Sequence, residues 1–183
     1  IARRQRQMCI RDRSQLGYAM NLEFSKLYGS GDDGSFPVKY RANCHCGAVM
    51  YAVCADPLDA KICHCQVCQN LHGAPMQWSA IFEKRHIRIL KGLAHICFYN
   101  SESRLAERIL PCKVSCMVCG AHIADEGRNM WLAFPTLFDF GRPPTVPLAF
   151  QPTCHIFYGN RCLDLSDNLP KWEGHKEKSK QLA

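Results

Sequence analysis

Three short cysteine clusters are the part of the sequence most able to do chemistry. They are Cys44-His-Cys46-Gly47, Cys63-His-Cys65-Gln-Val-Cys68 and Cys116-Met-Val-Cys119-Gly120. Cysteines spaced this closely are typical of metal-binding or redox turns and uncommon as structural disulfide partners. Gly47 and Gly120 allow the tight backbone that such a turn needs. The clusters therefore predict metal binding through thiolate sulfur.

Zinc suits these ligands, because structural zinc sites usually hold four thiolate or imidazole ligands in a tetrahedron. Two such turns usually make one site, so we expect a closed structural centre formed by Cys44, Cys46, Cys116 and Cys119. The remaining thiols are those of Cys63, Cys65 and Cys68. Three protein ligands with an open fourth position are typical of a catalytic zinc. We thus predict two zinc ions per chain, of which one has an open position.

A histidine could close the three-cysteine site instead, and both zinc ions would then be structural. The candidates are His64, His45 and His72. His64 is an awkward ligand, since in an extended segment it projects opposite to Cys63 and Cys65. The other thiols are expected to be small core residues or, in the tail, a bystander; they are Cys9, Cys54, Cys97, Cys112, Cys154 and Cys162. Cys112 could replace a ligand of the nearby Cys116 turn.

Short segments rich in branched or aromatic residues surround the clusters, with Gly, Pro and Asp between them. Such segments predict antiparallel strands packed as a sandwich or partial barrel. The expected strands cover 38–42, 48–53, 76–82, 86–90, 95–99, 106–110, 121–124, 130–134 and 155–158. The one expected helical turn covers 66–71. The predicted fold class is therefore mainly β, with little helix.

The formal charge of +7 is concentrated at the two ends of the 183-residue chain. Residues 1–13 hold five Arg and one Asp, and residues 171–183 hold four Lys and two Glu. A nucleic-acid-binding face needs basic residues gathered on ordered structure, so we do not expect a nucleic-acid partner. The most apolar stretch, 109–124, is interrupted by Lys113 and is too short to span a bilayer.

We predict three parts of the chain. Residues 1–34 are a disordered or artefactual extension that ends in a Gly- and Asp-rich linker, residues 35–173 are one zinc-binding domain, and residues 174–183 are a disordered basic tail. The chain starts at Ile1 without Met, so a targeting segment could precede it. Thirteen cysteines, an odd number with close spacing, favour a reducing compartment, the cytoplasm or the nucleus.

The order CxCG, CHCxxC with Gly73 behind it, and CxxCG resembles the zinc-binding domain of glutathione-dependent formaldehyde-activating enzymes and the centromere protein V group. The resemblance covers about residues 36–140 and continues in 155–172. It implies a β-tent fold of antiparallel sheets joined by zinc knuckles, with the zinc ligands given above. It also implies carbon–sulfur lyase activity on a thiol–aldehyde adduct such as S-hydroxymethylglutathione, with glutathione as co-substrate.

The residues agree with that chemistry. Three thiolates leave a zinc centre with a net negative charge, which makes hydroxide hard to generate but suits a thiol substrate. A small thiol that enters the fourth position would lose its proton and add to an aldehyde carbon. His64 and His72 are candidates for proton transfer; in the other interpretation they lie behind the zinc ligands or at the surface. Trp78 and Trp131 either wall a pocket or belong to the core.

Two residues depart from the family pattern, and one other class of function stays open. Gln69 stands where Arg is common, which removes a charge near an anionic thiol, and Ser115 stands where a hydrophobic residue is usual. The other class is a zinc-stabilised binding module without catalysis, similar to centromere protein V. An open coordination position favours the enzyme, because a binding module does not need one. The sequence does not predict the oligomeric state.

Overall fold

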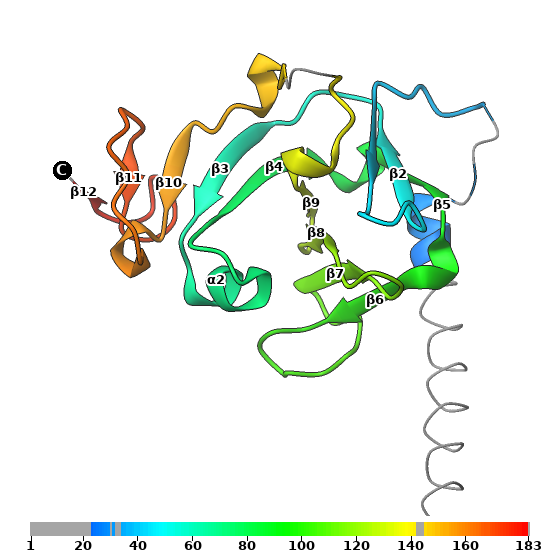
Figure 1. Cartoon of the computed structure of the whole chain (residues 1–183), viewed down its shortest axis with the longest axis horizontal. Coiled ribbons are helices and arrows are strands. Elements are labelled where there is room, and N and C mark those ends of the chain that lie inside the picture. The colour runs from blue at the N-terminus through cyan, green and yellow to red at the C-terminus, as the bar shows by residue number, and fades with distance from the viewer. Residues whose placement is uncertain (1–22, 30, 32–33, 142–144, 183) are drawn as a thin grey trace, which may run out of the picture.

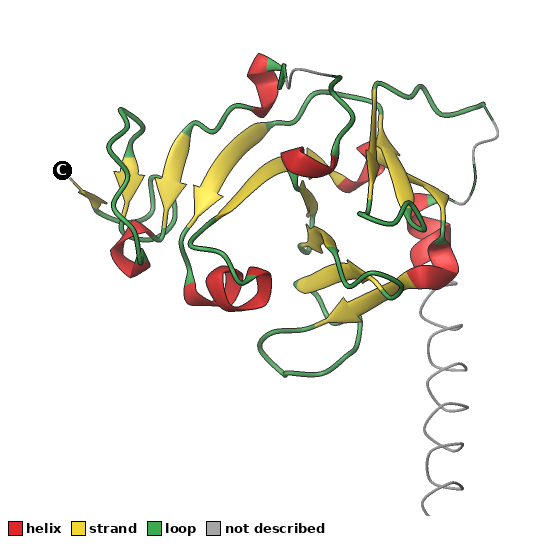
Figure 2. Ribbon diagram, viewed as in Figure 1, coloured by secondary structure: helices red, strands yellow, loops and turns green. Residues whose placement is uncertain are grey.

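The computed structural model describes residues 23–29, 31, 34–141 and 145–182. The strands form one small and one large sheet, shown in Figures 1 and 2. The small sheet has the order β1-β2-β5, with β1 (Tyr40–Asn43), β2 (Met50–Val53) and β5 (Ile87–Lys91). All its pairings are antiparallel.

The large sheet has the order β12-β11-β10-β3-β4-β9-β8-β7-β6. Its strands are β3 (Asp59–Cys63), β4 (Gln77–Glu83), β6 (Ile96–Tyr99), β7 (Cys112–Cys116), β8 (His122–Glu126), β9 (Met130–Ala133), β10 (Cys154–Ile156), β11 (Lys171–Trp172) and β12 (Gln181–Leu182). β10 runs parallel to both β3 and β11, and the other pairings are antiparallel. Among the described residues, 34% are in strands and 18% in helices, which confirms the mainly β prediction.

Helices are short and connect strands. The predicted helical turn is present as α2 (Gln66–His72), which ends at Gly73 in the left-handed conformation that favours glycine. The 3-10 turns are η1 (Lys84–His86), η2 (Leu93–His95), η3 (Pro135–Leu137), η4 (Leu148–Phe150) and η5 (Tyr158–Asn160). The strand predicted over 106–110 is absent; β7 begins only at Cys112, directly after Pro111, which has no N–H for a sheet ladder.

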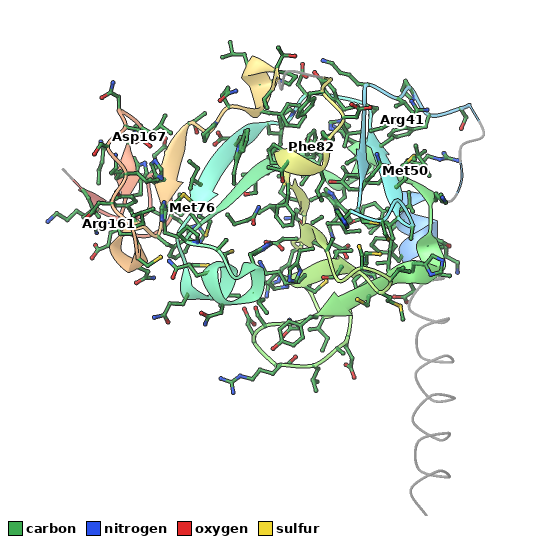
Figure 3. The ribbon with its side chains drawn as sticks, in the orientation of Figure 1. Arg41, Met50, Met76, Phe82, Arg161 and Asp167 are labelled. Carbon is green, nitrogen blue, oxygen red and sulfur yellow. The ribbon has the colours of Figure 1, made fainter. Side chains whose placement is uncertain are left out.

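The hydrophobic core joins the two sheets through aromatic side chains. Tyr51 of β2 packs on Trp131 of β9 with ring centroids 5.7 Å apart. Phe138 packs on Tyr51 and on Phe82 of β4, with ring centroids 5.8 Å and 6.4 Å apart, and Phe82 (labelled in Figure 3) is fully buried. Trp131 is fully buried, so it belongs to the core. Trp78 is half-buried and donates to the Phe150 carbonyl oxygen at 2.9 Å.

Part of the predicted N-terminal extension is ordered. Residues 23–28 are helical, and Phe24 and Tyr28 are 0% and 1% exposed. Phe24 packs on Phe98, and Tyr28 packs on Trp131, each with ring centroids 5.1 Å apart. The expected disorder over 1–34 is therefore wrong for 23–28, because two aromatic rings one helical turn apart fill the core. Residues 1–22 lie outside the described residues.

The predicted disorder of 174–183 is also wrong, for residues 174–182. β11 and β12 pair as a hairpin, with Lys171 opposite Leu182. Phe157 N–H donates to the Gly174 carbonyl oxygen at 3.0 Å, and Gly174 N–H donates to Ser179 Oγ at 2.8 Å. The tail is ordered because hydrogen bonds to the neighbouring turn satisfy its backbone groups.

Within the described residues, helices are too short or too polar to cross a membrane.

Candidate metal centres

The first cysteine group joins the small sheet to the large one. The Sγ atoms of Cys44, Cys46, Cys116 and Cys119 all lie within 4.8 Å of one another. Cys44 directly follows β1, and Cys116 ends β7. Each turn closes with a backbone hydrogen bond, from Gly47 N–H to the Cys44 oxygen at 3.0 Å and from Gly120 N–H to the Cys116 oxygen at 2.8 Å. Both glycines have positive φ, as the tight turns require.

The sulfur spacing in this group fits a tetrahedral zinc ion. Cys44 Sγ lies 3.6 Å from Cys46 Sγ, which lies 3.9 Å from Cys116 Sγ. Zinc–sulfur bonds of about 2.3 Å in a tetrahedron put the sulfurs about 3.8 Å apart. Backbone N–H groups favour the thiolate form, since Val49 N–H donates to Cys44 Sγ at 3.2 Å. Backbone N–H groups of Ala121 and Cys46 lower the pKa of Cys119 to about 6.

The second group is local in sequence. Cys63 ends β3, Cys65 is the N-cap of α2, and Cys68 lies in its first turn. Their Sγ atoms also lie within 4.8 Å of one another. Cys68 N–H donates to Cys65 Sγ at 3.4 Å, so the helix start holds two of the three sulfurs together. No histidine or carboxylate of the described residues belongs to either group.

The three thiols influence one another's pKa. Hydrogen bonds from Cys63 and Cys68 lower the pKa of Cys65 to about 2, and the contacts with Cys65 and Cys68 raise the pKa of Cys63. For Cys68, the contact with Cys63 lowers the pKa, but Cys65 and burial outweigh it and raise the pKa to about 11. A bound divalent cation would displace the remaining protons, because its ligands must be thiolates. This donor set fits a zinc ion with three protein ligands.

None of the three candidate histidines contributes a ring nitrogen to either group. His45 is exposed. His64 and His155 are fully buried, and His64 Nε2 donates to His155 Nδ1 at 2.9 Å. His155 Nε2 in turn donates to Asp167 Oδ2 at 2.8 Å, among the C-terminal strands (Figure 3). Burial lowers the pKa of His64 to about 4, so at neutral pH it is an uncharged member of this chain of hydrogen bonds.

His72 lines a cavity beside the second group. Its ring centroid lies 4.7 Å from that of His122 and 5.0 Å from that of Phe134. Burial lowers its pKa to about 4, with a further lowering by Lys113. The cavity has a volume of about 340 Å³, and its lining includes Gln77, which pairs with Cys63 across β3 and β4. The cavity therefore adjoins the β3–β4 pair at the end of β3 that carries Cys63, and none of the three cysteines lines it directly.

One charged side chain at the second group was not predicted as a site residue. Lys113 is 7% exposed, and its Nζ lies 3.5 Å from Cys68 Sγ and 2.6 Å from Asp125 Oδ2. Burial lowers the pKa of Lys113, but Asp125 and Cys68 outweigh it, so the pKa is raised. The only signal in the sequence is a lysine inside an otherwise apolar stretch. Its direction toward Cys68 depends on strand order, which the sequence does not show.

The two residues that depart from the family pattern fix α2 in place. Gln69 Nε2 donates to the His64 oxygen at 2.7 Å and to the Asn160 oxygen at 3.0 Å. Ser115 Oγ donates to His122 Nδ1 at 2.8 Å, and His122 Nε2 donates to the Leu71 oxygen at 2.9 Å. These bonds tie α2 to β7, β8 and the segment after β10.

The cysteines outside the two groups form no disulfides among the described residues. Cys112 is buried, and its Sγ lies 3.9 Å from Glu126 Oε2. It belongs to neither group, so it does not replace a ligand in the Cys116 turn. Cys54 and Cys97 are half-buried, Cys154 is buried and Cys162 is exposed. Cys9 lies outside the described residues.

The fold and these two groups define a mainly β protein whose clustered cysteines could hold zinc. The sequence model for the glutathione-dependent formaldehyde-activating enzyme matches residues 39–160, well over half of the chain, and the chain belongs to this family. A crystal structure of a Rhodobacter sphaeroides protein is similar, with 19% identity and a TM-score of 0.45, over 56% of this chain and 91% of that one. No protein with curated function matches the chain significantly.

Proposed function

We propose that the protein is a zinc-dependent carbon–sulfur lyase of the formaldehyde-activating type. It forms or cleaves a thiol–aldehyde adduct such as S-hydroxymethylglutathione, with glutathione as co-substrate. The observation that carries the proposal is the three-sulfur group, which no fourth protein donor among the described residues completes. Family membership supports the same activity. The close cysteine spacing supports a location of the protein in a reducing compartment, the cytoplasm or the nucleus.

The two groups have different roles in this proposal. Four cysteines would hold a structural zinc between the sheets, and Cys63, Cys65 and Cys68 would hold the second zinc. When bound there, zinc supplies the positive charge that keeps an incoming thiol deprotonated at neutral pH. The chain's own part is to keep three sulfurs on one side and leave the other side open.

The cavity of about 340 Å³ next to this group is the proposed binding site for the adduct. Its volume lies in the usual range for small-molecule sites. Its lining combines apolar Phe134 and Leu137 with polar Gln77 and Thr136. The apolar residues can pack against the carbon atoms of the adduct, and the polar groups can orient its hydroxyl.

Neither predicted proton carrier is a good base. The pKa values of His64 and His72 are both lowered to about 4 by burial, whereas efficient general bases have pKa values near the working pH. His72 therefore acts as an uncharged hydrogen-bond partner in the cavity.

In the forming direction the thiol sulfur bonds to the carbonyl carbon, the thiol proton leaves to solvent, and the carbonyl oxygen takes a proton from solvent. Cleavage reverses these steps.

Exchange NMR tests this activity directly. In a mixture of glutathione and formaldehyde, the exchange rate between free glutathione and its hydroxymethyl adduct should rise in proportion to added protein. Cys65→Ser should remove the increase, because Cys65 is one of the three sulfurs. Cys54→Ser is the matched control, since Cys54 is half-buried like Cys65 and lies outside both groups.

The competing class, a zinc-stabilised binding module, predicts a different result. A module without catalysis leaves the exchange rate at its value without protein, although the protein still binds zinc. A wild-type protein with full zinc content and no effect on exchange would therefore rule out the lyase and leave the module.

A further inference from the structure

Lys113 is a buried cation in direct contact with the three-cysteine group. It lies in β7 opposite Asp125 of β8, and the two side chains form an ion pair with an Nζ–Oδ2 distance of 2.6 Å. The lysine side chain is 8% exposed. Lysine is almost never buried without a partner. Here its ammonium has two, because Nζ also donates to Cys68 Sγ at 3.5 Å.

The contact makes the three sulfurs different from one another. Among the described residues, Lys113 gives Cys68 Sγ a charged donor, while Cys65 Sγ receives a backbone N–H at 3.4 Å. A hydrogen bond from an ionised donor is stronger than one from a neutral donor. Groups that hydrogen-bond a metal ligand orient it and change its donor strength. Cys68 is thus the sulfur whose position and electron donation depend on another side chain.

Charge gives the contact a second effect. Three thiolates and a divalent cation carry one net negative charge, and an incoming thiolate adds another. Gln69, at the neighbouring position of α2, brings no charge, and its amide is bonded to the backbone of His64 and Asn160. Among the described residues, the ammonium of Lys113 therefore supplies a cationic donor in direct contact with Cys68, and its ion pair with Asp125 holds it there.

We propose that Lys113, held by Asp125, is the positioning residue of the three-cysteine centre: its ammonium fixes Cys68 and offsets the thiolate charge, so that an anionic thiol can enter the fourth position. The entry of a thiol rests on the function proposed above. The effect of Lys113 on the metal centre does not rest on that function, and this effect can be measured without substrate.

Cadmium NMR measures the effect on the centre. Protein loaded with ¹¹³Cd should give one resonance for each cysteine group, and the resonance lost in Cys65→Ser identifies the three-sulfur group. Lys113→Met should move that resonance and leave the four-sulfur resonance unchanged, which makes the second resonance an internal control. Lys113→Arg should restore most of the wild-type position, because it keeps a cationic donor.

Lys84→Met is the matched control variant. Lys84 is also a mostly buried lysine paired with a carboxylate of β8, Glu126, at 3.0 Å. The Lys84→Met substitution removes an ion pair comparable to that of Lys113 with Asp125, but it should move neither cadmium resonance. If Lys113→Met does not fold, Asp125→Asn tests the same contact, since it releases the ammonium and should move the same resonance. An unchanged three-sulfur resonance in the folded variant, or an equal movement in Lys84→Met, would overturn the proposal.

Calorimetry on the zinc-loaded protein measures thiol entry. Lys113→Met should weaken glutathione binding by about tenfold, the scale of an outer-shell effect, and Lys113→Arg should restore it. S-Methylglutathione, which has no thiol, should show no such dependence. Equal glutathione affinity in wild type and Lys113→Met would overturn the charge role. If wild type binds no glutathione while the cadmium resonance still depends on Lys113, the proposed function fails and the positioning role stands.

Discussion

Paired serine variants of the two cysteine groups test the different roles that the structure gives them. One variant replaces Cys116 and Cys119, and the other replaces Cys65 and Cys68. The design is matched, because each pair contains one buried and one half-buried cysteine. The first change removes the β7 half of the four-sulfur group, and the second leaves a single sulfur in the three-sulfur group.

The expected loss of stability follows from the length of the loop that each cysteine group closes. Cys46 and Cys116 are 70 positions apart, and a cross-link over such a loop stabilises by about 4 kcal/mol in the chain-entropy account. The second group closes a segment of only a few residues, for which the same relation gives about 2 kcal/mol. For a chain of this size, 1 kcal/mol shifts the melting temperature by about 2–4 °C.

Circular dichroism melts of the zinc-loaded proteins measure the difference. The Cys116 and Cys119 variant should melt about 8–16 °C below wild type, and the Cys65 and Cys68 variant about 4–8 °C below it. Cys54→Ser should melt close to wild type. Equal decreases for the two paired variants, or a larger decrease for the Cys65 and Cys68 variant, would refute the assignment of the four-sulfur group as the tie between the sheets.

Three smaller predictions concern the frame around the site. Tyr28→Phe removes the 2.8 Å hydrogen bond to buried Glu126 and should lower the free energy of unfolding by about 1–2 kcal/mol in urea titrations; no loss would mean that the 23–28 helix is not docked. Gly92→Ala places a Cβ 1.9 Å from a backbone oxygen, so it should cost clearly more stability than Gly31→Ala, which has similar φ and open space; equal melting temperatures would contradict this. The pKa of Asp167 is lowered from 3.8 to about 2, because bonds from Lys171 and His155 outweigh the effect of burial. Its contribution is therefore complete above about pH 4 and is lost as pH falls toward 2, so the stability difference between wild type and Asp167→Asn should shrink over that range. A constant difference across the range would contradict this assignment.

The cysteine spacing predicted both sulfur groups because short-range patterns determine the turns. Cys65 and Cys68 lie at the start of one helix, and Gly47 and Gly120 close turns whose φ values require glycine. Most strands were predictable for a similar reason, since branched and aromatic residues with intervening turns identify short strands. β3 and β7, which carry Cys63 and Cys116, were not among the expected strands.

The parts that the sequence did not predict depend on distant contacts. Lys113 pairs with Asp125 because the β7–β8 register sets the two residues opposite each other, and it contacts Cys68 because the fold brings α2 close to β7. Phe24 and Tyr28 precede a Gly-rich stretch that favours a linker, and their burial depends on Phe98 and Trp131 far along the chain. Neither the strand register nor the packing of the N-terminal helix on the core produces a local sequence pattern, so both became visible only in the structure.

Metal content tests the central claim most directly. Elemental analysis of the reduced wild-type protein should give two zinc ions per chain, and a variant with serine at Cys63, Cys65 and Cys68 should keep one. Fewer than two zinc ions in wild type, or the loss of both in the variant, would contradict the division of seven cysteines into two independent centres.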